Sequence, residues 1–229
     1  MTAVLAKMAE RKPVCAVAEA FEGFDEYAIK ATGSQIDPHI WMDVAGWMRA
    51  LGAVSKTLNS YDPSFGAHYA KRTDSYLAIL GRLDEYVREV VQTIPLEQRV
   101  LVTAHDAFGY MARAYGFEVR GVQGLSTEAK PGLKDIEVLV DFLVERKIPA
   151  VFVESSVSRK SVEALIEGAK AQGHRVVIGG QLFSDSMGPG GTYEGTYVGM
   201  MDHNVNTIAS ALGGAVPDGG FRKWSKSKP

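Results

Sequence analysis

The sequence predicts an α/β protein in which one long helix leads into a region of alternating strands and helices. From Arg99 onward, short apolar runs alternate with longer segments whose apolar residues recur every three or four positions. Ahead of this region, the same helical spacing continues without a break over residues 63–94. Strand–helix alternation produces parallel strands with right-handed crossovers, so we expect a parallel sheet with flanking helices.

The composition narrows the function classes that fit this chain. Its 229 residues are 46% hydrophobic and 23% charged, which suits one or two globular domains with a substantial core. A formal net charge of −2 gives no electrostatic footprint for nucleic acid. Cys15 is the only cysteine, so neither an intrachain disulfide nor a thiolate metal cluster is expected. The first ten residues are amphipathic and charged, and we expect no signal peptide in this chain.

The N-terminal segments are expected to form only part of a lobe. Residues 1–10 are predicted as a helix, because their apolar side chains share one helical face. The apolar run Val14–Val17 is expected to be a strand, and the polar stretch 19–35 a loop. One strand cannot bury the face of a sheet, so this lobe is predicted to be incomplete, with a part missing before Met1.

Two helix starts follow, each marked by an Asp-Pro pair. Asp37-Pro38 and Asp62-Pro63 each combine a capping side chain with a proline suited to the first helical position. The second helix is predicted over residues 63–94 and would be about 45 Å long, against about 11–12 residues for a typical helix. Such a helix serves as a spine between lobes or as half of a coiled coil. The Ala and Gly residues between its apolar positions favour the spine.

The alternating region completes the predicted organisation. Strands are expected at 99–103, 117–122, 149–153 and 174–178, and helices at 106–115, 132–146, 158–172 and near 195–211. The basic C-terminal segment follows a Gly/Pro-rich break and is expected to be disordered, because chain ends fray unless they are tied down. The predicted domains are a partial N-terminal lobe (1–61), an interlobe helix (62–94), a C-terminal α/β lobe (95–212) and a disordered tail (213–229).

Polar side chains gather where the predicted strands end. His105 follows the first strand of the C-terminal lobe, Glu154 follows the third, and Asp185 lies in the loop after the fourth. Ligands of parallel sheets bind beyond the carboxyl ends of the strands, so we expect these three side chains at one rim. His39 differs from them because it stands at a predicted helix start.

The residue types at this rim suit a metal ion. Imidazoles and carboxylates together are ligands for zinc, manganese or iron, whereas the absence of sulfur argues against copper(I). One alternative is structural: His39 would bond locally and His105 would be a satisfied interior histidine. Another is a metal-dependent hydrolase that uses His105 and Glu154, with Glu154 as the base. The sequence contains no nucleophile elbow, no H-E-x-x-H and no Walker loop.

Five segments resemble the metal-binding solute receptors of zinc/manganese ABC importers, of the TroA type, over residues 1–212. They are DPHIWMDV (37–44), VLVTAHDAFGYMARAYGFEV (100–119), VFVESSV (151–157), GGQLFSDSMG (179–188) and GTYVGMMDHN (195–204). Their order and spacing along the whole chain make the resemblance far more specific than any single motif.

The resemblance implies two (β/α) lobes joined by a long rigid helix, with the metal held between them. His39 would be a ligand from the N-terminal lobe, and His105 and Asp185 would be ligands from the C-terminal lobe. Glu154 would lie beside the site and orient a ligand. The family has a further histidine ligand in a segment that would precede Met1, so this chain would supply three of four ligands and bind metal more weakly.

The function implied by the resemblance is that of a binding protein, not an enzyme. It would capture zinc, manganese or iron and pass the ion to the membrane permease of an ABC importer. The full-length form would be a monomer outside the cytoplasm, in the periplasm or as a membrane-anchored lipoprotein. The present chain would be a truncated form, and a remnant that binds no metal is a third possibility. The sequence leaves the identity of the metal open, since selectivity depends on geometry and metal supply.

Overall fold

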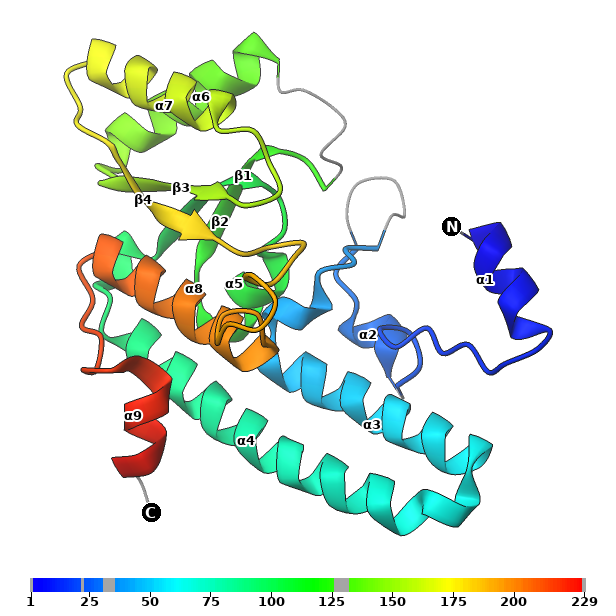
Figure 1. Ribbon diagram of the computed structural model, residues 1–229. Helices are drawn as coiled ribbons and strands as arrows, with labels where there is room; N and C mark the ends of the chain where they lie inside the picture. The colour runs from blue at the N-terminus through cyan, green and yellow to red at the C-terminus, as the bar shows by residue number, and fades with distance from the viewer. Residues whose placement is uncertain (1, 22, 31–35, 126–131, 228–229) are drawn as a thin grey trace. The chain divides into compact units, whose positions relative to one another are not determined.

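The computed structural model describes residues 2–21, 23–30, 36–125 and 132–227, and Figure 1 shows their helices and strands. The chain divides into two compact units, Met1–Arg82 and Leu83–Pro229. We call them the N-terminal unit and the C-terminal unit, and each is described by itself. The boundary falls inside the long helix α4 (Gly66–Gln92), where a helix was predicted over 63–94.

The N-terminal unit consists of helices joined by loops in its described part, with one isolated β-bridge between Lys30 and Ile36. Besides the first part of α4, its elements are α1 (Thr2–Ala9), α2 (Phe24–Tyr27), η2 (Ile40–Met42), α3 (Val44–Tyr61) and η3 (Pro63–Phe65). The strand predicted at Val14–Val17 is wrong, because an apolar run becomes a strand only where a second strand pairs with it. Of the predicted loop 19–35, residues 24–27 form α2, and residues 22 and 31–35 lie outside the described residues.

The helix start predicted at Asp37-Pro38 is also wrong. Helix α3 begins at Val44, and Asp43 is its capping residue, because the Asp43 Oδ1 accepts a hydrogen bond of 2.9 Å from the Ala45 N–H. The Asp37 carboxylate is engaged by His39 instead. The second predicted start holds, since Pro63 opens the short helix η3 that leads into α4.

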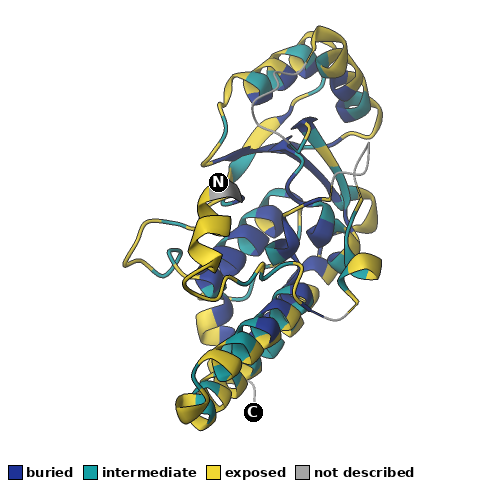
Figure 2. Cartoon of the chain, turned by 90° about the vertical axis from the view of Figure 1, so that its right-hand side faces the viewer, coloured by how far each residue is buried: buried dark blue, intermediate teal, exposed yellow. Residues whose placement is uncertain are grey.

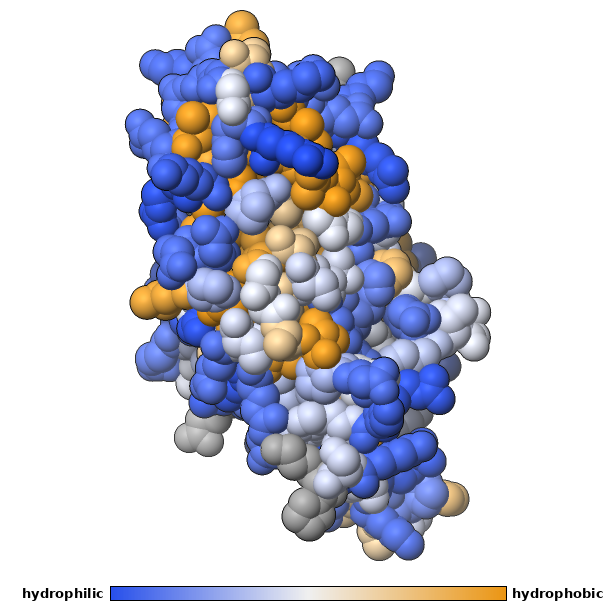
Figure 3. All heavy atoms as spheres, turned by 90° about the vertical axis from the view of Figure 1, so that its left-hand side faces the viewer, coloured by the Kyte–Doolittle hydropathy of each residue, from blue (hydrophilic) through white to orange (hydrophobic). Residues whose placement is uncertain are grey.

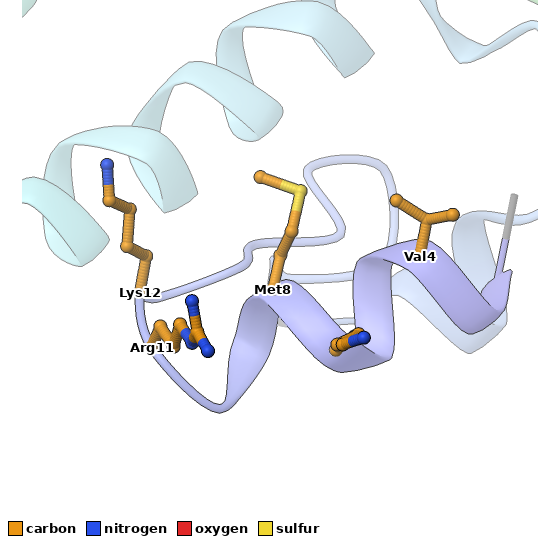
Figure 4. Close-up of a pocket in the computed structure, with 5 residues that line it drawn as sticks. Val4, Met8, Arg11 and Lys12 are labelled. Atoms are coloured by element: carbon orange, nitrogen blue, oxygen red, sulfur yellow. The ribbon is translucent and has the colours of Figure 1, made fainter.

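Helix α1 carries an apolar face that the N-terminal unit does not bury. Val4, Leu5 and Met8 share this face as predicted, and all three are exposed. Figure 4 shows Val4 and Met8 beside a cavity of about 560 Å³, which Arg11 and Lys12 also line. The face therefore adds little to the core of the described protein.

The C-terminal unit contains the predicted parallel strands. They form two parallel pairs, β1 (Val100–His105) with β2 (Glu118–Gln123) and β3 (Ala150–Glu154) with β4 (Val177–Leu182). β1 lies against β3, so the four strands make one layer. In Figure 1, α6 (Leu133–Glu145) and α7 (Lys160–Ala171) cover one face of this layer, while α5 (Gly109–Tyr115) and α8 (Tyr197–Ala211) lie on the other.

The core lies between the strands and the helices α6 and α7. Every residue of β1 and of β3 is buried, as Figure 2 shows by the dark blue of the central strands. Continuous burial is typical of parallel strands covered on both faces, which explains why these two strands read as uninterrupted apolar runs. The core residues are Val100, Val102, Ala104, Val122, Leu139, Val140, Leu143, Ile148, Val151, Val153, Val162, Leu165, Ala169 and Val176.

Strand β4 begins three residues later than predicted. Gly173 ends the preceding helix with a φ of 79°, a left-handed conformation that glycine adopts readily. The His174 ring then bonds at 2.8 Å to the carbonyl of Ile148, which lies just before β3. The chain pairs with β3 only from Val177 onward. Val177 and Ile178 remain exposed, and Figure 3 shows hydrophobic side chains open among hydrophilic ones on one face of the molecule.

The C-terminal tail corrects another prediction, because residues 220–227 are ordered as helix α9 (Gly220–Ser227) rather than disordered. Phe221 and Trp224 are only 5% and 7% exposed. The Trp224 Nε1–H donates a hydrogen bond of 2.9 Å to Glu89 in α4, and the Phe221 N–H donates one of 2.9 Å to Asp202 in α8. Two aromatic side chains three residues apart thus tie the tail down. Residues 228–229 lie outside the described residues.

One finding concerns the helices as a group. Among the residues that the structure describes, no helix combines the length and the apolar character needed to cross a membrane.

Candidate metal centre

Three of the predicted site residues meet at the carboxyl ends of the strands in the C-terminal unit. His105 is the last residue of β1, Glu154 is the last residue of β3, and Asp185 lies in the loop after β4. The His105 Nδ1 is 2.6 Å from Glu154 Oε2, and the His105 Nε2 is 3.4 Å from Asp185 Oδ1. The expectation of a common rim therefore matches the placement of these three side chains.

Glu154 holds His105 at two points. One oxygen of its carboxylate faces the His105 Nδ1, and the other accepts a hydrogen bond of 2.8 Å from the His105 backbone N–H. Both residues are buried, so solvent competes little with these bonds. The carboxylate thereby favours the tautomer with the proton on Nδ1 and directs Nε2 toward Asp185.

The electrostatics of the cluster favour positive charge at His105. Burial lowers the pKa of His105, but the hydrogen bond that its ring donates to Glu154 and the negative charges of Glu154 and Asp185 raise it, and the net pKa lies above the ordinary 6.5. Two carboxylates therefore surround one imidazole. A divalent cation would satisfy the same negative environment without needing a proton on the ring.

Asp185 is the most exposed of the three, with 37% of its side chain accessible. The two residues that precede it in the loop are nevertheless held in place. The buried Ser184 places its Oγ 3.1 Å from that of Ser156, beyond the end of β3. The Asn204 amide of α8 accepts a 2.9 Å hydrogen bond from the Phe183 N–H and donates one of 2.7 Å to the Phe183 carbonyl. Sequence reasoning missed these anchors; the one signal was a polar Asn within an otherwise apolar helix face.

His39 belongs to the N-terminal unit and has a carboxylate partner of its own. Its Nδ1 is 2.7 Å from Asp37 Oδ1, and the same oxygen accepts a 2.9 Å hydrogen bond from the His39 backbone N–H. Both residues are buried. Asp37 therefore relates to His39 as Glu154 relates to His105: a carboxylate engages Nδ1, and Nε2 is the nitrogen suited to a ligand role. The sequence prediction had treated Asp37 only as a helix cap.

The other three histidines of the sequence lie at exposed or partly buried positions outside this cluster. His68 is exposed on α4. His174 and His203 direct their Nε2 atoms to the backbone carbonyls of Ile148 and Gln181, at 2.8 and 2.9 Å.

An α/β frame with a long helix, and buried histidines oriented by carboxylates, is the arrangement expected of a metal-binding protein. The chain belongs to the family of the zinc-uptake complex component A, periplasmic (ZnuA), whose model matches residues 1–211. The resemblance drawn from the five motifs is thus confirmed. These comparisons give no support to the hydrolase alternative.

Individual relatives agree with the family. The chain is 46% identical over 212 residues to the zinc-binding protein TroA of Treponema pallidum, covering 93% of this chain and 68% of TroA. It is 47% identical over 212 residues to the manganese-binding lipoprotein MntA of Bacillus subtilis, covering 93% and 69%. The solved structure of the periplasmic zinc-binding protein TroA from Treponema pallidum matches with a TM-score of 0.88, covering 93% of this chain and 76% of that one. The fold of the relatives therefore extends over nearly the whole chain.

Proposed function

We propose that this chain captures a divalent transition metal, zinc or manganese, as the substrate-binding component of an ABC importer. His39, His105 and Asp185 are the ligands in this proposal, and Glu154 orients His105. The single observation that carries the proposal is the placement of His105 and Asp185 at 3.4 Å, with Glu154 behind the imidazole.

The distance between the two C-terminal ligand atoms supports a shared ion. Two atoms that each lie about 2.05 Å from a tetrahedral zinc ion are about 3.3 Å apart. The His105 Nε2 and Asp185 Oδ1 are 3.4 Å apart, so an ion can bind both with little movement of either side chain.

His39 is proposed as the ligand from the N-terminal unit. Its Asp37 partner engages Nδ1, the arrangement that prepares Nε2 for a metal. Two neutral imidazoles and one carboxylate would leave a divalent ion with a net charge of +1. Such a set suits zinc, manganese and iron alike, and the relatives include one named for zinc and one named for manganese.

The remaining parts of the proposal follow from the family. The protein acts as a monomer outside the cytoplasm and hands the ion to a membrane permease. A family described as periplasmic and a relative described as a lipoprotein support this location.

Isothermal titration calorimetry of the metal-free protein tests the proposal. We expect the wild type to bind about one equivalent of zinc or manganese, and His105→Ala and Asp185→Ala each to abolish binding. His68→Ala is the matched control, since His68 is an exposed histidine of α4. Unchanged affinity in both ligand variants, with folding verified by circular dichroism, would refute the assignment.

A further inference from the structure

Gln123 is a buried polar residue next to the candidate metal centre that the site described above does not use. It is the last residue of β2 and is only 9% exposed. Its amide oxygen Oε1 is buried and has no hydrogen-bond partner in the described part of the chain. Buried polar atoms in folded proteins are almost always bonded, so an amide oxygen of this kind points to a donor that binds there.

The strand register places Gln123 beside His105. The two residues are Cα partners in the parallel pair β1–β2, and such partners project from the same face of a sheet about 4.8 Å apart. Their predecessors Ala104 and Val122 both belong to the core cluster on the opposite face. Because successive side chains of a strand alternate, Gln123 and His105 share the face that leads to Asp185.

The missing donor is not the imidazole of His105. Its Nδ1 faces Glu154 and its Nε2 faces Asp185. A donor that fits beside these groups is a water molecule bound to the captured ion, since coordination to a cation strengthens the hydrogen bonds that water donates.

We propose that Gln123 determines metal specificity: its amide oxygen accepts a hydrogen bond from a water molecule on the captured ion. This inference rests on the proposed function. A retained water adds an oxygen ligand to the imidazoles and the carboxylate. Water and carboxylate oxygens are ligands that suit manganese, whereas imidazole nitrogen suits zinc, so a water held by Gln123 favours manganese relative to zinc.

The test compares manganese and zinc affinities of the wild type, Gln123→Leu and Gln123→Met by competition with a chelating dye. Both variants replace the amide with an apolar group of similar size and so remove the amide oxygen. We expect manganese affinity to fall about ten-fold, the range for residues that support metal ligands, and zinc affinity to fall less. Gln98→Leu is the matched control, because Gln98 also has a buried amide oxygen without a partner among the described residues but precedes the opposite end of β1.

A second readout separates specificity from a structural role. The water-proton relaxivity of the manganese-loaded protein reports water bound to the ion, and it should decrease in Gln123→Leu and stay unchanged in Gln98→Leu. A zinc-to-manganese affinity ratio equal to that of the wild type, or an unchanged relaxivity, overturns the role of Gln123.

The outcomes also distinguish this inference from the proposed function. If the wild type binds metal and His105→Ala does not, while Gln123→Leu keeps the wild-type ratio, only the role of Gln123 is rejected. If the wild type binds neither manganese nor zinc, the proposed function is rejected and this inference with it.

Discussion

Glu154 shows how one buried carboxylate orients a histidine that we propose as a metal ligand. It contacts the His105 ring at 2.6 Å and accepts the His105 backbone N–H at 2.8 Å, so both the position and the tautomer of the ring depend on it. His39 has a similar partner in Asp37, at 2.7 Å. At the scale of residues, the proposed site contains two His–carboxylate pairs, His105 with Glu154 and His39 with Asp37, and each pair lies within one unit.

Replacing Glu154 with glutamine tests this dependence. Glu154→Gln keeps the size of the side chain but removes its charge, so the ring should be oriented less firmly and be less basic. We expect metal affinity to fall about 10- to 100-fold, with the fold retained. A chelator competition titration measures the change, and Glu167→Gln on the exposed face of α7 is the control. Wild-type affinity in Glu154→Gln would contradict the orienting role.

The raised pKa of His105 predicts how binding responds to acid. A metal ligand must be deprotonated, and the net effect of Glu154 and Asp185 on the His105 pKa is upward from 6.5. Protonated His105 stabilises the metal-free protein below that value, and this contribution disappears as the pH rises through the folded pKa.

As the pH is lowered, we therefore expect the affinity for zinc or manganese to start falling while the pH is still above 6.5. The affinity should then fall by about ten-fold per pH unit for each proton taken up. Calorimetric titrations between about pH 5.5 and 8 measure the profile around the ordinary histidine pKa. In Glu154→Gln the fall should begin at lower pH. A profile that is flat over this range, or the same in both proteins, would contradict the assignment.

At the scale of elements, the C-terminal helix α9 is a stabilising part of the C-terminal unit. Its Phe221 ring lies 5.6 Å from the Tyr86 ring, and its Trp224 ring lies 5.3 Å from it, edge-on in both cases. Asp202 of α8 also accepts a hydrogen bond from the Phe221 N–H. Gly220 allows this approach, since a Cβ there would meet Asp202 Oδ1 at 2.9 Å in a backbone of positive φ.

Truncating Trp224 should show how much this helix contributes. Trp224→Ala removes a buried ring and its hydrogen bond to Glu89, and we expect a loss of about 3 kcal/mol in the free energy of unfolding. Urea denaturation followed by circular dichroism gives the value. The exposed Lys226 provides the control, for which Lys226→Ala should change stability by less than about 0.5 kcal/mol. Equal stability of the two variants would mean that α9 does not stabilise the unit.

The sequence patterns predicted correctly those elements that depend on residues near one another in the chain. The ends of β1 and β3 lie within two residues of their predicted ends, because an apolar run between turn residues specifies a buried strand by itself. The run Val14–Val17 has the same appearance but has no partner strand among the described residues, and partners are set by the whole fold. Trp224 and Phe221 were missed for a related reason, since their contacts lie far away in sequence.

The residues of the candidate site also differ in whether the sequence alone could predict them. His105, Glu154 and Asp185 could be predicted because each lies at or just after the end of a strand, and parallel strands end at one rim. Gln123 lies at a strand end too, but amides are common on surfaces and its type gives no signal. Only the register with His105 and the buried oxygen bring it to attention.

At the scale of the whole molecule, the two units have different roles in the proposed site. The C-terminal unit holds an oriented imidazole and a carboxylate in a fixed geometry at the rim of its strands. The N-terminal unit offers one buried imidazole with its own carboxylate. The central claim of the proposed function is that one ion has His39 and His105 as its nitrogen ligands.

X-ray absorption at the zinc edge tests that claim most directly, because it counts the imidazoles around the ion. The zinc-loaded wild type should show two imidazoles with Zn–N distances of about 2.0–2.1 Å and no sulfur. His39→Ala should show one imidazole, and His105→Ala should retain no zinc. Fewer than two imidazoles in the wild type, or two that persist in His39→Ala, would contradict the proposal that His39 and His105 both bind the ion.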